Sequence, residues 1–295
     1  MSNLLIALMI LIYTFQAAFC NLYAKHYPGK KKYASPVYSV IYGLLVALGT
    51  LVFAGFSFHP SKIVLILGIV NGATLVVYNT MLIKAADLGP FSVTMIFNLS
   101  GGILIPMLWT VLHDREPLSV WQMIAIGVML VSFVLLNLED KKEGESGKVS
   151  LRFLLTISCL GFANGLYGIL INAAEKISEG RENTEMIVTT FAVSAVLAFV
   201  LLLFEARSEA IPAFRQTARS AFSALSASVC ACAAVNLLMY VLSLVNPAVL
   251  YTMDNGGVLI VSVLWSAFFL REKLDRRKIL GLILAIGAIF ALSIL

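Results

Sequence analysis

The chain has 295 residues, of which 60% are hydrophobic and only 13% are charged, and its mean hydropathy is +0.94. Soluble globular domains carry a charge on roughly 25% of their residues, so this composition excludes a soluble protein and indicates an integral membrane protein. The formal net charge of +5 does not indicate a nucleic-acid partner, because the loops of membrane proteins collect Lys and Arg to set their orientation.

The first half of the chain contains five long apolar runs. A helix needs ~20 residues to cross ~30 Å of hydrocarbon, and each run is of about that length. We predict these helices at residues 4–21, 36–56, 63–86, 91–112 and 120–138. No basic residue precedes the first run and no small-residue cleavage pattern follows it, so we expect a retained helix rather than a signal peptide.

A hydrophilic run at residues 139–150 lies at the midpoint of the chain. Three more apolar runs follow at 151–174, 186–204 and 221–245, and two others flank the charged turn at 271–278. We therefore predict an all-α integral membrane protein with ten transmembrane helices. Five belong to residues 1–138 and five to residues 151–295, with 139–150 as the linker.

The two halves carry a diverged repeat. Trp109 and Trp265 share an offset of 156 residues with the pairs Arg115-Glu116 and Arg271-Glu272. A repeat of half the chain indicates duplication. Because each half has an odd number of helices, the second repeat is expected to insert upside down, an arrangement typical of transporters with a substrate site at the repeat interface.

Asp254 alone among the 16 acidic residues lies well inside an apolar run. It is roughly 9 Å from the start of its helix, and an aspartate at such depth costs ~2–3 kcal/mol on insertion scales. We expect it to face the protein interior or a water-filled cavity, where it binds a substrate cation or couples transport to a proton. The alternative is a structural aspartate that is hydrogen-bonded to Asn98, its counterpart in the first repeat, or to another buried amide.

Amide and phenol side chains inside the runs predict the lining of a cavity. They are Tyr13, Gln16, Asn71, Tyr78, Asn98, Asn164, Tyr167, Asn236, Tyr240 and Tyr251. Tyr251 precedes Asp254 by one turn, and an aromatic ring beside a carboxylate suits an amine or quaternary ammonium group. Each amide could instead form a helix–helix hydrogen bond worth ~0.6 kcal/mol, and tyrosines also occur in interfacial belts.

Other features favour packing over chemistry. The glycine pairs Gly101-Gly102 and Gly256-Gly257 indicate kinks or close packing, since no Lys-Ser/Thr follows them as in a phosphate loop. Gly281, Ala285 and Ala288 form a stripe that packs either within the chain or at a homodimer seam, so monomer and homodimer both stay open. We find no metal-ligand spacing and no nucleophile–base set, so we expect neither cofactor nor enzyme activity.

The proline, small-residue turn and Arg-Glu pair before the last helix of each half resemble the ten-helix, EamA-like branch of the drug/metabolite transporter superfamily. The best-matching segment is 256–295, with a first-half copy at 113–118. The resemblance implies alternating-access secondary transport of amino acids, amines or other small metabolites. Some members carry nucleotide sugars, sugar phosphates or lipid-linked intermediates, but the lack of a deep Lys or Arg argues against anionic cargo here.

The working hypothesis is a proton- or gradient-driven carrier of a small zwitterionic or cationic metabolite such as an amino acid, amine or choline-like compound. A lipid-intermediate flippase and a non-transporting scaffold are the alternatives. Seventeen of the 21 Lys and Arg residues lie in loops after the odd-numbered predicted helices. The positive-inside rule places these loops in the cytoplasm, so we expect a multi-pass protein of the cytoplasmic membrane with both termini outside.

Overall fold

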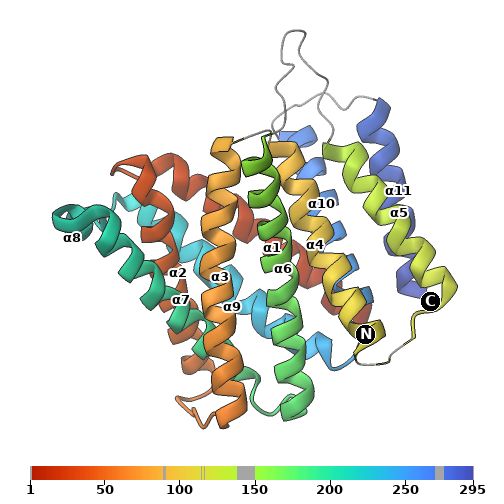
Figure 1. Ribbon diagram of the computed structural model, residues 1–295, viewed down its shortest axis with the longest axis horizontal. Helices are drawn as coiled ribbons and strands as arrows, with labels where there is room; N and C mark the ends of the chain where they lie inside the picture. Colours follow the sequence, from red (N-terminus) through yellow and green to blue (C-terminus); the bar gives the residue numbers. More distant parts are fainter. Residues whose placement is uncertain are drawn as a thin grey trace. The chain divides into compact units, whose positions relative to one another are not determined.

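A computed structural model describes residues 2–88, 91–113, 115, 117–137, 150–269 and 276–294. This part of the chain is helical, with no strand among the described residues (Figure 1). The elements are α1 (Ser2–His26), α2 (Lys31–Phe53), α3 (Lys62–Leu88), α4 (Phe91–Leu112), α5 (Val120–Asn137), α6 (Leu151–Ser178), α7 (Asn183–Ala206), η1 (Arg207–Glu209), α8 (Ala210–Ala213), α9 (Ala218–Leu242), α10 (Pro247–Phe269) and α11 (Arg276–Ile294).

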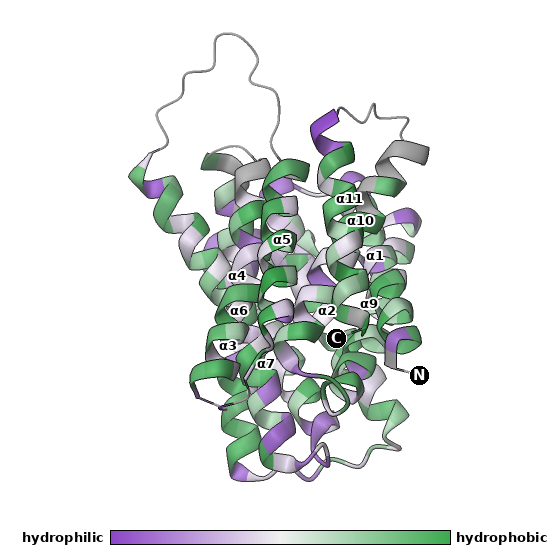
Figure 2. Ribbon diagram, turned by 90° about the vertical axis from the view of Figure 1, so that its right-hand side faces the viewer, coloured by the Kyte–Doolittle hydropathy of each residue, from purple (hydrophilic) through white to green (hydrophobic). Residues whose placement is uncertain are grey.

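All ten predicted helices are present among the described residues. Seven of the described helices are long and apolar enough to cross a membrane. Figure 2 shows apolar residues along the helices and hydrophilic residues gathered at several helix ends. Since only helices and closed barrels satisfy every backbone polar group within lipid, these features define a multi-pass membrane protein.

The helix ends extend beyond the apolar runs. The first helix continues to His26, and the second begins at Lys31, five residues before the predicted start at Pro36. Pro36 lies in the second turn, where its missing N–H removes one backbone bond near an end that carries lysines. Hydropathy marks where apolar side chains stop, whereas a helix ends where its backbone hydrogen bonds can no longer continue.

The start of α9 shows a second such difference. Its N-cap is Thr217, whose Oγ1 accepts a hydrogen bond from the Ser220 amide at 3.2 Å, while Ser220 Oγ accepts one from the Thr217 amide at 2.9 Å. This reciprocal capping box satisfies donors that a helix start otherwise leaves unpaired. The helix consequently starts at Ala218, three residues before the predicted position.

The chain divides into two compact units, and each draws segments from both predicted repeats. Unit 1 contains residues 1–7, 80–169 and 245–295, and unit 2 contains residues 8–79 and 170–244. Within unit 1, α10 packs against α4, α5 and α11, and α5 packs along α11; within unit 2, α2 packs against α7 and α9. Of the predicted linker 139–150, only Ser150 lies among the described residues.

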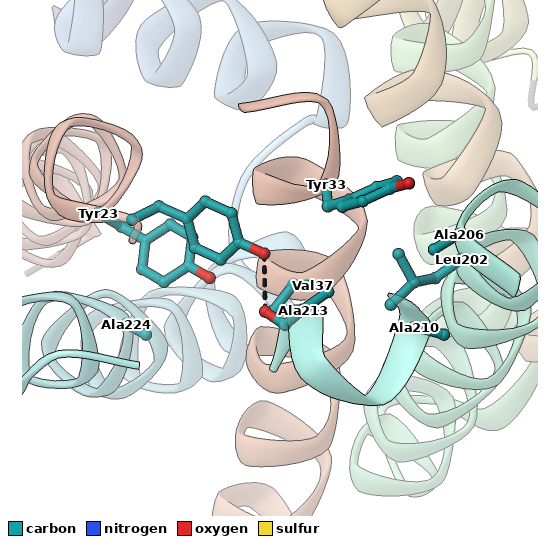
Figure 3. Packing of buried hydrophobic residues seen from close by; sticks show 9 residues of the cluster. Tyr23, Tyr33, Val37, Leu202, Ala206, Ala210, Ala213 and Ala224 are labelled. Atoms are coloured by element: carbon teal, nitrogen blue, oxygen red, sulfur yellow. Dashed lines mark hydrogen bonds between the residues drawn. The ribbon is translucent and has the colours of Figure 1, made fainter. Parts of the chain in front are cut away.

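The core of unit 2 lies where the start of α2 meets the end of α7 (Figure 3). Tyr23, Tyr33 and Leu202 are buried there together with small residues of α7, α8 and α9. The Tyr27 hydroxyl donates a hydrogen bond of 2.7 Å to the Ala213 carbonyl at the end of α8, drawn dashed in Figure 3. Hydropathy did not indicate α8, because four residues form no apolar run.

In unit 1, the small-residue stripe of α11 packs within the chain. A Cβ on Gly281 would lie 2.9 Å from Leu136 Cγ and 3.0 Å from Leu135 Cβ of α5. Ala285 and Ala288 are buried. Small residues let two membrane helices approach closely, and this stripe serves the contact between α5 and α11.

Candidate functional site

Asp254 lies near the middle of α10, in unit 1. Its side chain is half-buried. The Oδ1 atom is buried, and no described residue gives it a hydrogen bond. At this oxygen, the bond from Asn98 or another amide that was the structural alternative for Asp254 is therefore not made by any described residue.

Tyr251 and Asp254 both face α6. The Tyr251 hydroxyl donates a hydrogen bond of 2.9 Å to the Gly168 carbonyl, which fixes its ring against that helix. Tyr167 of α6 is half-buried and close enough to the Asp254 carboxylate to interact with it electrostatically. The spacing of one helical turn on α10 thus directs a phenol ring and a carboxylate toward the same neighbouring helix.

Three helices of unit 1 bring amide groups together over Gly102. The Asn164 side chain of α6 donates a hydrogen bond of 2.9 Å to the Asn98 carbonyl of α4. A Cβ on Gly102 would lie 3.2 Å from Asn164 Cγ and 3.4 Å from Asn255 Nδ2. Only a glycine leaves room for both amides at this point of α4, where α6 and α10 meet.

Asn255 is a site residue that the sequence analysis missed. Its Nδ2 donates a hydrogen bond of 2.8 Å to the Tyr251 carbonyl one turn earlier on α10. It is half-buried, like Asp254 beside it. Its position directly after the one intramembrane acid was the signal that could have identified it.

Glycines also bring α4 and α6 into backbone contact. A Cβ on Gly101 would overlap the Gly161 backbone, and a Cβ on Gly161 would lie 2.6 Å from the Phe97 carbonyl. A Cβ on Gly165 would lie 2.7 Å from the Gly101 carbonyl. This seam sets the separation of α4 and α6, and with it the distance between Asn98 and Asn164.

Two other predicted site amides belong to unit 2 and bridge helices there. Asn71 is fully buried, and its Nδ2 lies 3.4 Å from Thr190 Oγ1 of α7. Asn236 of α9 donates hydrogen bonds to Thr50 Oγ1 of α2 at 3.1 Å and to the Cys232 carbonyl at 2.7 Å. Both contacts have the form of the helix–helix hydrogen bonds that were the alternative for these residues.

The remaining predicted site residues also lie in unit 2. Gln16 donates a hydrogen bond of 3.0 Å to the Tyr42 hydroxyl. Tyr13 and Tyr78 are half-buried, whereas Tyr240 is 54% exposed. The predicted residues therefore form a compact polar group around Asp254 in unit 1 and a separate set in unit 2.

The repeat motif is described only in part. Trp109 stacks on His113, with 4.2 Å between the ring centroids. The side chain of Trp265 and the residues Glu116, Arg271 and Glu272 lie outside the described residues. Among the side chains that the structure describes, no group of three or more His, Cys, Asp or Glu could hold a metal ion.

No family model and no curated protein matches this chain. A solved structure, described only as "Crystal structure of protein", is similar over 99% of this chain and 98% of that chain, with a TM-score of 0.74 and 13% sequence identity. An identity this low bears on the fold alone. The chain therefore shares its fold with a protein of known structure.

Proposed function

We propose that this protein is a secondary-active membrane carrier that works by alternating access and transports a small zwitterionic or cationic metabolite. Amino acids, amines and choline-like compounds are the substrate class. The observation that carries the proposal is the buried Oδ1 of Asp254, which has no hydrogen-bond donor among the described residues. A buried polar atom without a partner costs ~1–3 kcal/mol, so an ammonium group or a proton that reaches it gains a ready partner.

The neighbours of Asp254 suit such a substrate. The ring of Tyr251, one helical turn before Asp254 and held by its bond to Gly168, offers an aromatic group on the same side of α10 as the carboxylate. Tyr167 adds a second phenol close to the acid. The amides of Asn164 and Asn255 supply neutral donors and acceptors for the carboxylate or hydroxyl of a zwitterion, without a cation that would compete for Asp254.

We also propose a family and a membrane orientation for this chain. The paired motifs and the ten helices support membership of the EamA-like branch of the drug/metabolite transporter superfamily, with two inverted five-helix repeats. The excess of Lys and Arg after the odd-numbered helices supports a cytoplasmic membrane location with both termini outside. In this account the protein binds and moves its substrate without chemical change.

One observation favours a lipid-intermediate flippase as the second candidate. An apolar groove of about 620 Å³ lies between α5 and α11, and its lining includes Trp121, Val128, Gly287 and Phe290. An open apolar groove on membrane helices could accept a lipid chain during transfer of a headgroup. The carboxylate of Asp254 has no role in that scheme, which makes the two functions separable by experiment.

Uptake into proteoliposomes separates these functions. The purified chain is reconstituted and supplied with labelled amino acids, amines and choline, with and without a pH gradient, beside an uncharged isostere of choline and a sugar phosphate. The carrier proposal predicts gradient-dependent uptake of zwitterions or cations and none of the two controls. Scrambling of labelled lipid without uptake would favour the flippase, and inactivity in both assays would favour a scaffold.

A further inference from the structure

Five aromatic rings of unit 2 contact one another in a row, here called the tyrosine ladder, in which the Tyr38–Tyr42 pair is stacked and the other pairs are tilted or edge-to-face. Successive centroid distances along Tyr27, Tyr23, Tyr38, Tyr42 and Phe191 are 5.8, 5.1, 5.3 and 5.6 Å. Tyr38 and Tyr42 lie ~10 and ~16 Å along α2 from its first residue. The ladder therefore leads from the end of the helices that carries the lysine-rich turn toward the middle of α2.

Most of the ladder hydroxyls have hydrogen-bond partners within unit 2. Tyr27 donates to the Ala213 carbonyl at 2.7 Å, Tyr23 accepts from Gln216 at 3.3 Å, and Tyr42 accepts from Gln16 at 3.0 Å. These bonds fix three of the rings in place. The ladder is thus a preorganised row of phenols rather than a set of freely rotating side chains.

Tyr38, at the centre of the ladder, differs from these three. Its hydroxyl oxygen is buried, and the hydrogen-bonding group beside it is the Cys20 thiol. A thiol is a weak hydrogen-bonding group, so this hydroxyl is less strongly held than those of Tyr23, Tyr27 and Tyr42.

Tyr33, which lies outside the ladder, contacts a lysine ammonium group. The Lys32 ammonium lies over the ring of Tyr33, 4.7 Å from its centroid. The Tyr33 hydroxyl donates to Glu209 Oε2 at 3.1 Å, and Lys30 pairs with the same carboxylate at 2.6 Å. Tyr33 belongs to the same core cluster as Tyr23 and Tyr27. A ring of the core cluster that holds two of the ladder tyrosines therefore contacts a cation in this structure.

From these contacts we propose that the tyrosine ladder is a second binding site, specific for organic ammonium groups. The cation contacts the half-exposed rings of Tyr38 and Tyr42. The inference deepens the proposed function, because it rests on a cationic substrate for its physiological role. Binding to the ladder itself requires no contribution from Asp254, which lies in the other unit.

The test measures equilibrium binding of choline by the purified full-length chain in detergent, beside the uncharged isostere in which carbon replaces nitrogen. The proposal predicts that choline binds and that the isostere binds at least ~10-fold more weakly. Tyr42→Leu should weaken choline binding ~10-fold, and Tyr38→Phe, which keeps the ring, should weaken it less. Phe204→Leu, an exposed aromatic change on α7, should leave this binding unchanged. Asp254→Asn, which lacks the carboxylate proposed to bind the same cation in unit 1, should still bind choline at the ladder, and Tyr42→Leu should weaken the binding that remains in that background.

A second readout needs no change to the ladder. Choline, and not the isostere, should slow alkylation of Cys20 beside Tyr38 in the unaltered chain, with Cys159 of α6 as the internal control. Protection that the isostere matches would overturn the proposal, as would unaltered choline binding in Tyr42→Leu or no choline binding at all. Loss of all binding in Asp254→Asn would overturn the ladder but not the carrier. Intact uptake in Asp254→Asn would overturn the role of Asp254 in transport and leave the ladder in place.

Discussion

Gly101→Ala tests the seam on which the candidate site depends. A Cβ at Gly101 would overlap the Gly161 backbone, and a backbone cannot rotate away as a side chain does. Gly161 is itself within close range of the Phe97 carbonyl, so α6 cannot yield locally. The added methyl group must therefore push α4 and α6 apart, which lengthens the Asn164–Asn98 bond of 2.9 Å.

Two opposing effects set the expected change in the stability of Gly101→Ala. Overpacking costs ~1–3 kcal/mol, and alanine in a helix interior gains ~1 kcal/mol over glycine. Gly127 of α5 is the matched control, because a Cβ there would meet nothing within 4 Å and Gly127→Ala should show only the gain. The free energies of unfolding of the two alanine variants should therefore differ by the full overpacking cost. Each kcal/mol of this difference corresponds to ~2–4 °C in melting temperature.

The assay is thermal melting of both variants in the same detergent, followed by uptake into proteoliposomes. Gly101→Ala should melt below the unaltered chain and Gly127→Ala at or above it, and only the former should lose uptake. Equal melting temperatures for the two variants would refute the close approach of α4 and α6.

Two further predictions concern unit 2. Glu185 is buried and accepts a hydrogen bond from the His59 amide at 3.1 Å, so Glu185→Met, which removes the acceptor, should lower stability by ~1–2 kcal/mol. Lys30→Met, at the exposed pair with Glu209, should leave the melting temperature nearly unchanged. Comparable melting temperatures for these two variants would contradict this ranking. Thr217→Ala removes the capping box of α9 and should cost ~1 kcal/mol. The measurement is amide hydrogen exchange in the first turn of α9, which should become faster in Thr217→Ala and stay unchanged in Thr156→Ala, a half-buried threonine within α6. Unchanged exchange in Thr217→Ala would exclude the cap.

Hydropathy predicted the ten long helices because a helix that crosses the hydrocarbon needs an apolar run of ~20 residues, and the length of such a run can be read from the sequence. It misplaced ends such as His26 and Lys31, which depend on backbone hydrogen bonding beyond the apolar run. Hydropathy also did not predict the short α8, because Ala213 at its end is held by a tertiary hydrogen bond from Tyr27 and not by an apolar run. The division into two units depends on contacts between helices of different repeats, which no local pattern records.

The candidate site was predictable to the extent that an intramembrane acid is rare. Asp254 identified α10, and the one-turn spacing identified Tyr251 as its companion. Asn255, which directly follows Asp254, was missed although other single amides inside the apolar runs were predicted to line the cavity. The role of Gly102 in making room for two amides could not be predicted, because it depends on how α4, α6 and α10 meet.

The central claim is that Asp254 meets a positive charge during transport. The most direct measurement compares proteoliposome uptake by Asp254→Asn, Asp254→Glu and the unaltered chain over a range of pH. The account predicts that the asparagine variant loses uptake at least ~10-fold together with its pH dependence, while the glutamate variant, which keeps the charge, retains part of both. Full uptake with unchanged pH dependence in Asp254→Asn would contradict it.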